Sequence, residues 1–145
     1  MSVEQVARDF VSHMNNAETM NTMVTADAMA SGGVLPQPIP IAEATKVMDG
    51  LMTAFPDLKF EVKQVTVNGN QATVNTMWSG RNSGPLSLPM PGMPAIPATG
   101  KTVSVKDTYI VTVLGDKVSH MQMDSPADGG LPAALAQMGV KMPGM

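Results

Sequence analysis

The stretch AFPDLKFEVKQVTVNGNQATVNTMWSGRNSGPL, residues 54–86, decides the fold of this chain. Pro56 ends a helix, and two β-prone runs follow, one before Asn68 and one from Gln71 to Gly80. Asn68 and Gly69 stand between the runs, and both residue types tolerate the positive φ that a two-residue hairpin turn requires. The stretch therefore predicts a long antiparallel hairpin that follows a helix.

Such a hairpin can curve around a helix and leave a pocket between the two. Its side-chain pattern contains one conflict. With Asn68-Gly69 as the loop, Val65 pairs with Ala72 on one face, whereas Phe60 and Val62 fall on the other. Either both faces are partly buried, or a β-bulge near residues 63–64 switches the pleat and bends the sheet.

The rest of the chain places helices first and strands afterwards, which predicts an α+β fold. Apolar residues recur at helical spacing in the first part of the chain, and they alternate in the later runs. Gly115-Asp116 predicts a second tight turn. The expected helices are 3–14, 18–24, 41–55 and 131–138, with an extended piece at 28–34 and further strands at 101–114 and 117–124.

The 145 residues fit a single domain, 1–145, and are enough to bury a core. A net charge of −3 argues against nucleic-acid binding, and the absence of cysteine excludes disulfides and thiolate metal sites. No run is long and apolar enough for a membrane span, and the first residues lack a secretory signal, so a soluble, cytoplasmic protein is expected. The 15 methionines suit either an ordinary core or a pocket that adapts to an apolar ligand.

Residues 84–100 form a Pro/Met-rich connection between two expected strands, too long for a simple turn. Its prolines favour an ordered arm that closes a pocket mouth or lies across a second subunit. Residues 139–145 are expected to be a flexible tail. No metal site is expected, because the repeat of Met-Pro-Gly-Met at 90–93 and 142–145 supplies too few ligands.

Several segments resemble, in order, the SnoaL-like polyketide cyclase family of the nuclear-transport-factor-2-like superfamily. They are FPDLKF at 55–60, NG at 68–69, GP at 84–85, TGK at 99–101, DTY at 107–109 and GDKV at 115–118. The resemblance implies a strongly curved antiparallel sheet wrapped around helices, a deep apolar pocket and a homodimer. It also implies cofactor-free aldol ring closure of a polyketide ester, with an aspartate in the pocket moving the proton.

Asp107 is the leading candidate for that acid. It stands among alternating valines on the apolar face of an expected strand, where a carboxylate costs several kcal/mol unless it is paired or protonated. Burial disfavours the charged form, which suits a group that takes and returns a proton. The alternatives are that Lys106 or a neighbouring strand satisfies it, or that the face is half exposed.

The last expected strand offers two sets of side chains. His120, Gln122 and Asp124 alternate on one face, and Met121 and Met123 lie on the other. If the first face lines the pocket, the imidazole, amide and carboxylate converge there on a ligand carbonyl. A slip of one residue turns them outward and leaves the two methionines inside. Asp124 is also explained as a turn residue at the strand end.

Three further residues complete the candidate site. Tyr109 can donate its phenol hydrogen to a developing enolate oxygen, or it is a core tyrosine with its hydroxyl at the rim. Trp78 is expected in the ligand pocket, in core packing or at a subunit interface, and Asn75 either in the pocket or exposed. The leading hypothesis is a cofactor-free cyclase acting on a small hydrophobic carbonyl compound. The alternatives are a non-catalytic binder of a small apolar ligand and a purely structural subunit.

Overall fold

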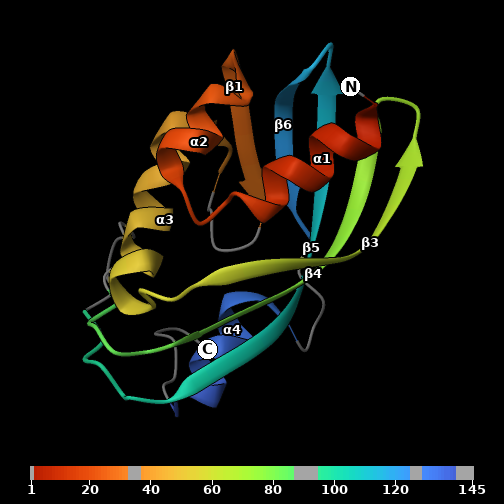
Figure 1. The fold of residues 1–145 in the computed structure, drawn as a ribbon. Helices are drawn as coiled ribbons and strands as arrows, with labels where there is room; N and C mark the ends of the chain where they lie inside the picture. Colours follow the sequence, from red (N-terminus) through yellow and green to blue (C-terminus); the bar gives the residue numbers. More distant parts are fainter. Residues whose placement is uncertain (1, 33–36, 87–94, 125–128, 140–145) are drawn as a thin grey trace.

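The computed structural model describes residues 2–32, 37–86, 95–124 and 129–139. A curved, open six-stranded sheet in the order β2-β1-β6-β5-β4-β3 carries helices against it (Figure 1). Neighbouring strands are antiparallel except β1 and β6, which are parallel. This confirms the α+β prediction. The elements are α1 (Val3–Ser12), α2 (Ala17–Thr22), β1 (Val24–Gly32), β2 (Ile39–Pro40), α3 (Ile41–Ala54), β3 (Lys59–Asn68), β4 (Gln71–Arg81), β5 (Thr102–Leu114), β6 (Lys117–Met123) and α4 (Gly130–Gln137).

Helix α1 covers one face of the sheet, which we call the inner face. Ser2 caps the helix through a capping box: its hydroxyl accepts from the Gln5 backbone N–H, and the Gln5 side chain accepts from the Ser2 N–H. The apolar stripe of α1 is buried against β3, β4, β5 and β6. The opposite face of the sheet is called the outer face.

The hairpin of β3 and β4 forms as expected, but its loop is displaced by one residue. Asn68 pairs with Gln71, so Gly69 and Asn70 form the two-residue turn, and the predicted Asn68-Gly69 loop is wrong. Gly69 has φ +66°, and no non-glycine residue that the structure describes has a positive φ. A glycine alone at the first turn position is typical of a type II′ turn, which needs no positive φ from asparagine.

A bulge at Lys63 resolves the conflict in the hairpin pattern. Val62 pairs with Thr76 and Gln64 pairs with the next residue, Asn75, so Lys63 is the extra residue. The bulge shifts the pleat, and Phe60 therefore pairs with Trp78 on the inner face. The predicted bulge near residues 63–64 is confirmed.

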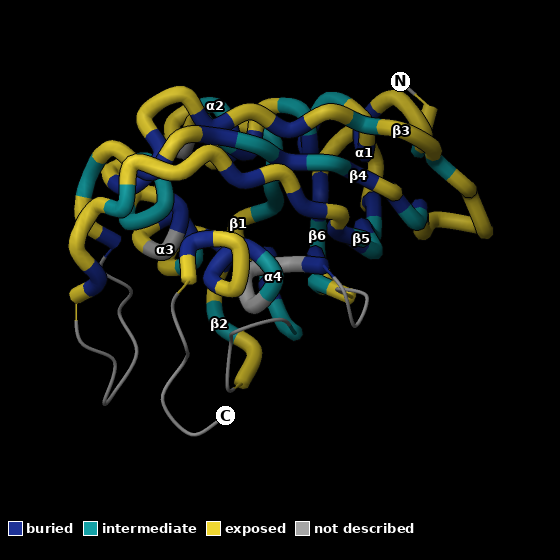
Figure 2. The backbone as a smooth tube through the Cα atoms, turned by 90° about the horizontal axis from the view of Figure 1, so that it is seen from below, coloured by how far each residue is buried: buried dark blue, intermediate teal, exposed yellow. Residues whose placement is uncertain are grey.

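Strands β4 and β5 form the centre of the sheet, and their residues alternate between buried and more exposed positions (Figure 2). The inner residues of the two strands are all buried. They are Ala72, Val74, Thr76, Trp78 and Gly80 on β4, and Val103, Val105, Asp107, Tyr109, Val111 and Val113 on β5. The turn between β5 and β6 is Gly115-Asp116, as predicted, with Gly115 at φ +64°.

Strand β6 is shorter than β5 and pairs only with its second half, from Tyr109 to Leu114. The first half of β5 therefore has an edge that β6 does not cover. Helix α4 lies along that edge, where the Gln137 side chain accepts from the Ser104 N–H and donates to the Ser104 carbonyl, both at 2.9 Å. This amide pair replaces the missing strand partner.

The base of the Pro/Met-rich arm is closed by polar contacts. Leu86 and Ile96 form an isolated antiparallel bridge. The fully buried Asn82 side chain donates to the carbonyls of Ala54 and Gly84 and accepts from the backbone and hydroxyl of Thr99. The proposed closing of a pocket by the arm concerns residues 87–94, which lie outside the described residues, as does the tail from 140 onward. No helix that the structure describes is long and apolar enough to cross a membrane.

Candidate active site

The Asp107 side chain lies on the inner face at the middle of β5 and is only 6% exposed. The alternation of β5 places it in line with buried valines, as the sequence predicted. A buried carboxylate requires compensating partners. The surroundings of Asp107 therefore decide what this site can do.

Among the described residues, three donors contact the Asp107 carboxylate. Oδ2 accepts from the Tyr109 hydroxyl at 3.1 Å and from the Trp78 indole N–H at 3.4 Å, and Oδ1 accepts from the Thr108 backbone N–H at 3.0 Å. Tyr109 reaches it because residues two apart on a strand share a face. Trp78 reaches it from β4, where it pairs with Val105. These bonds compensate the burial of the carboxylate.

Aromatic rings form the wall around this carboxylate. Trp78 packs edge-on against Phe55 at 6.0 Å between ring centroids, and Phe60 lies 6.5 Å from both Trp78 and Tyr109. The chain has five aromatic residues, so four of them gather at Asp107. Phe60 reaches the cluster only because the bulge at Lys63 turns it inward. The acid thus lies in an apolar, ring-lined part of the core.

The phenol of Tyr109 remains protonated in these surroundings. Burial raises the pKa of the Tyr109 phenol well above its ordinary value, and the negative charge of Asp107 and the hydrogen bond to it act in the same direction. The phenol is therefore a donor, and its single hydrogen is directed to Asp107.

The remaining candidate residues divide between the two faces of the sheet. Met121 pairs with Val111 and Met123 with Tyr109, so both methionines lie on the inner face with Asp107. His120 pairs with Thr112 and Gln122 with Ile110, so they lie on the outer face. Asp124 follows β6, is exposed, and its N–H donates to the Thr108 carbonyl. Asn75 is exposed on the outer face.

The structure therefore does not bring His120, Gln122 or Asp124 together with the Asp107 carboxylate, whereas Asn75 and Asp107 both line one hollow of the sheet. The outward register of the last strand, one of the two alternatives above, is the one observed. His120 instead contacts Ser31 of β1, with 2.8 Å between Nε2 and Oγ. This bond links the parallel pair of strands.

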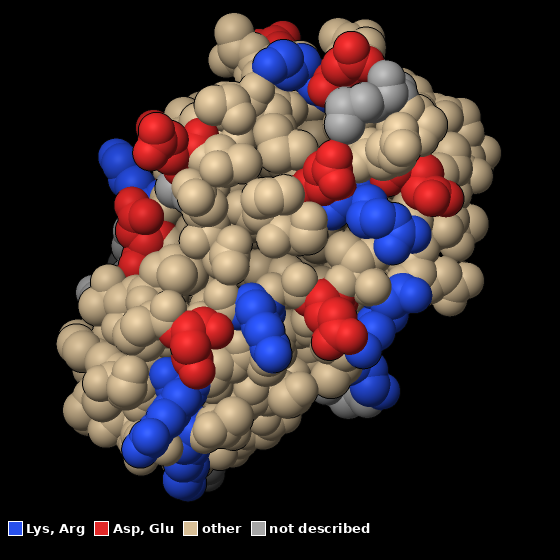
Figure 3. All heavy atoms as spheres, viewed as in Figure 1, with Lys and Arg blue, Asp and Glu red and all other residues tan. Residues whose placement is uncertain are grey.

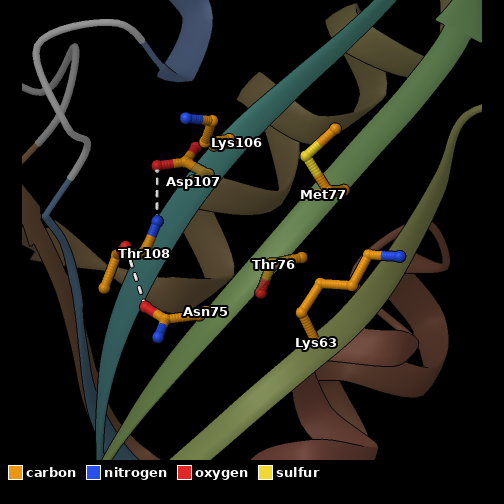
Figure 4. A pocket seen from close by; sticks show the side chains of 7 residues that line it. All are labelled: Lys63, Asn75, Thr76, Met77, Lys106, Asp107 and Thr108. Carbon is orange, nitrogen blue, oxygen red and sulfur yellow. Dashed lines mark hydrogen bonds between the residues drawn. The ribbon is translucent and has the colours of Figure 1, made fainter.

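A second feature, a hollow of about 260 Å³, lies on the outer face over β3, β4 and β5 (Figure 4). Lys63 and Lys106 line it from opposite strands, and Met77 stands between those strands. At one end the Thr108 hydroxyl donates to the Asn75 side-chain oxygen at 3.3 Å. Helices lie behind the strands in Figure 4, so the hollow opens on the side away from them.

Sequence reasoning missed several residues that the structure places near these sites. Phe55 and Phe60 were assigned only to a helix and a strand, although the predicted bulge was the signal that Phe60 could turn inward. Nothing in the local sequence indicated that the Asn82 side chain is buried and makes several hydrogen bonds. Among the described residues, no group of three or more His, Asp or Glu side chains could hold a metal ion.

Comparison with solved structures finds the same fold in several bacterial proteins. A proposed SnoaL-like polyketide cyclase from Jannaschia sp. CCS1 has a TM-score of 0.74 and 20% identity, over 96% of this chain and 92% of that one. IdmH, a proposed polyketide cyclase from Streptomyces antibioticus, has a TM-score of 0.73 and 17% identity, over 97% and 100%. A protein with a ketosteroid isomerase-like fold from Catenulispora acidiphila DSM 44928, solved with trimethylamine, has a TM-score of 0.70 and 13% identity, over 94% and 93%.

At these identities the structural likeness shows the fold alone. No curated protein matches the chain. The model of one family, described as SnoaL-like polyketide cyclase, matches residues 3–123, which include α1, every strand and the aromatic cluster around Asp107. The chain belongs to the SnoaL-like polyketide cyclase family.

Proposed function

We propose that this protein catalyses acid/base ring closure of a small hydrophobic carbonyl compound, with the Asp107 carboxylate carrying the proton. The observation that carries the proposal is the buried carboxylate on the inner face, held by Trp78 and Tyr109 and walled by aromatic rings. Family membership and the fold shared with proposed cyclases support it.

The proposed reaction is an intramolecular aldol closure. The carboxylate takes a proton from the carbon next to one carbonyl group, and the electron pair of the broken C–H bond forms an enolate. The enolate carbon bonds to a second carbonyl carbon, whose π electrons move to its oxygen. That oxygen then takes the proton back from Asp107. The carboxylate is restored and no electrons are gained or lost, so acid/base chemistry alone completes the reaction.

Within this proposal Tyr109 and Trp78 are positioning residues. The sequence suggested that the Tyr109 hydroxyl polarises a substrate oxygen, but its hydrogen is directed to Asp107 in the structure. Two donors on one carboxylate oxygen fix the orientation of the carboxylate, and Oδ1 accepts from the Thr108 N–H. A carboxylate that is already held in one orientation loses no further rotational freedom when it meets the substrate proton.

The test uses an open-chain heptanedione whose carbonyls, at the second and sixth carbons, allow aldol closure to a six-membered β-hydroxy ketone, which becomes an enone when it loses one molecule of water. Appearance of the enone follows ring closure, and deuterium uptake next to the carbonyls follows proton abstraction alone. Asp107→Asn keeps the size of the side chain but removes the base, so both rates are expected to fall by about 10²- to 10⁴-fold. Turnover by the Asp107→Asn variant at the original rate would refute the role of Asp107.

Two variants control this experiment. Asp49→Asn makes the same chemical change at an exposed position on α3 and is expected to leave the rate unchanged. Tyr109→Phe is expected to shift the pH profile of the rate, because it removes a donor from Asp107 while leaving the carboxylate in place. A purely structural role for Tyr109 would lower the rate at all pH values equally.

The second candidate function is binding of a small apolar ligand without reaction. The hydrogen bonding of Asp107 favours it, because both carboxylate oxygens already have donors in the absence of a substrate. Trp78 is the single tryptophan of the chain, so its fluorescence reports ligand entry beside Asp107. A binder would bind heptanedione with unchanged affinity after Asp107→Asn and would show no deuterium uptake.

A further inference from the structure

A serine and a histidine meet on the outer face of the sheet. Ser31 lies on β1 and His120 on β6, the two neighbouring strands that run parallel. The Ser31 Oγ lies 2.8 Å from His120 Nε2. A serine hydroxyl beside an imidazole nitrogen has the geometry of a nucleophile next to its base when the two atoms are about 2.6–3.2 Å apart. The contact therefore fits a chemical role as well as a structural one.

Irregular strand pairing brings these two side chains together. Strand β1 advances by five residues between Val24 and Met29, while the paired segment of β6 advances by only two. In a regular ladder from Val24 onward, His120 would pair with Ala26 instead of Met29. Ser119 of β6 is, in addition, an extra residue in the pairing with β5. Bulges re-aim side chains and are common next to active sites, so this irregularity is consistent with a functional site.

The pair is held in place and is also reachable from outside. Ser31 and His120 are both half-buried, and among the described residues their mutual contact is the one hydrogen bond that either side chain makes. The next residue, Gly32, has φ +82°, and a Cβ there would collide with the Met123 carbonyl oxygen. This close approach of β1 to β6 fixes the backbone beside the Ser31 hydroxyl.

Gln122 supplies a third polar side chain next to the pair. It is paired with Ser31 across the two strands, lies on the same face as His120, and is exposed. A side-chain amide can donate a hydrogen bond to a carbonyl oxygen on which negative charge develops during a reaction. A nucleophile, a base and an oxyanion donor thus come from neighbouring positions of two strands.

The residues paired with these three side chains carry no fixed charge. Met29 is paired with His120 and Ile110 with Gln122, so an apolar side chain of β1 and another of β5 flank the site. Thr112 is the partner of His120 on β5. By contrast, acidic and basic side chains are interspersed over the face of the molecule in Figure 3. A small uncharged substrate with an apolar part therefore matches these surroundings better than an ion.

The other histidine of the chain also has a serine beside it, but in a different arrangement. His13 Nδ1 lies 2.7 Å from the Asp9 carbonyl oxygen, so this nitrogen carries the ring hydrogen and donates it. The Ser12 hydroxyl is 3.4 Å from the same nitrogen and donates to the Asp9 carbonyl at 3.1 Å. A nitrogen that carries its hydrogen cannot accept one from a hydroxyl, so Ser12 and His13 are a matched control.

We propose that Ser31 is a nucleophile that accepts the acyl group of a small uncharged ester, with His120 as its base. The Ser31 Oγ bonds to the ester carbonyl carbon while its proton passes to His120 Nε2. The bond from that carbon to the leaving oxygen then breaks, and the leaving alcohol takes the proton from His120. Water releases the acyl group as an acid by the same steps and restores the serine. No electrons are gained or lost, so the ester and water are the only reactants.

Incubation of the full chain with p-nitrophenyl acetate tests the proposal. A burst of nitrophenol is expected, together with an acetyl group on Ser31 in a peptide mass map. Ser31→Ala is expected to abolish the burst, and His120→Gln to slow acetylation by about 10²- to 10⁴-fold. Ser12→Ala and His13→Gln make the same chemical changes on α1 and at its end, and they are expected to leave both signals unchanged.

Gln122→Leu keeps the approximate size of the side chain without its amide and is expected to slow acetylation at least about tenfold. Circular dichroism checks that each variant is folded, and His120→Asn is the second substitution if His120→Gln is not. Absence of an acetyl group on Ser31, equal acetylation of Ser12, or an unchanged rate in a folded His120 variant would each overturn the proposal. None of these results depends on whether Asp107 is catalytic, because the experiment follows an acyl group on β1.

Discussion

The two faces of β4 and β5 share one backbone but surround their charged groups in different ways. On the inner face, Asp107 lies among valines and aromatic rings and is held by Trp78 and Tyr109. On the outer face, one residue away, Lys106 and Thr108 border an open hollow. A charged group on the inner face needs neutral donors built around it, whereas charged groups on the outer face are stabilised by water. The expected effects of substitution therefore differ most between neighbours on the same strand.

The largest difference is expected between Trp78→Ala and Met77→Ala. Loss of the buried indole removes its contacts with Phe55 and Phe60 and a donor to Asp107, so the free energy of unfolding should fall by about 3–5 kcal/mol. Met77 is partly exposed, and its truncation should cost less than about 1 kcal/mol. Urea unfolding followed by far-ultraviolet circular dichroism measures both. Equal costs would mean that the two faces are equally packed.

A smaller difference is expected between two hydroxyl deletions. Tyr109→Phe removes a hydrogen bond to the buried carboxylate and should lower the free energy of unfolding by about 1.5–3 kcal/mol. Thr108→Val removes only the bond to Asn75 on the outer face and should change it by less than about 0.5 kcal/mol. The same unfolding experiment compares them. A larger cost for Thr108→Val would contradict the assignment of the faces.

A further prediction concerns the dependence of stability on alkaline pH, which reports on the buried Tyr109 phenol of the inner face. The folded-state pKa of Tyr109 is raised above its unfolded value of about 10, so above that pH the unfolded chain has lost a proton that the folded chain retains. Stability present below about pH 10 is therefore lost as the pH rises, by up to about 1.4 kcal/mol per pH unit relative to Tyr109→Phe.

The ultraviolet absorbance of tyrosinate checks this directly, because Tyr109 is the single tyrosine of the chain. The signal is expected to appear only together with unfolding. Tyrosinate formation near pH 10 in the folded protein, with unchanged circular dichroism, would show that the hydroxyl reaches water.

The smallest effects are expected for charge changes on the outer face. Lys106→Gln and Lys63→Gln should each change the free energy of unfolding by less than about 0.5 kcal/mol, because their side chains are exposed. Urea unfolding at low and high salt measures this. A loss above about 1 kcal/mol would mean that the lysines have a structural role, which would weaken the comparison between the faces.

Much of the fold could be predicted because its signals are local. The capping residues Ser2 and Gln5, the helix stop at Pro56 and the alternation of β5 are properties of short segments. The predicted turn lies one residue too early. Both Asn68-Gly69 and Gly69-Asn70 are residue pairs that suit a two-residue turn. The choice between them depends on the pairing of the hairpin with β5 and its packing against α1. The bulge at Lys63 could be predicted as one of two alternatives, because the sequence already showed Phe60 and Val62 on the opposite face from Val65 and Ala72.

The candidate site could be predicted only in part. The alternating valines of β5 identified Asp107 as buried, and the spacing of two residues placed Tyr109 on its face. The face of His120 could not be deduced, because a register shift of one residue between β5 and β6 exchanges the sets. Asn82 was missed because two of its three partner residues, Ala54 and Thr99, come from distant segments of the chain.

The sequence by itself determined the order of the helices and of the strands other than β2, the family resemblance and the presence of one carboxylate on an apolar strand face. Only the tertiary structure decided the partners of Asp107, the inward turn of Phe60, the outward position of His120 and the hollow between Lys63 and Lys106. The reason is physical: periodicity and turn chemistry act within a few residues, whereas register, bulges and hydrogen-bond partners depend on contacts between distant segments.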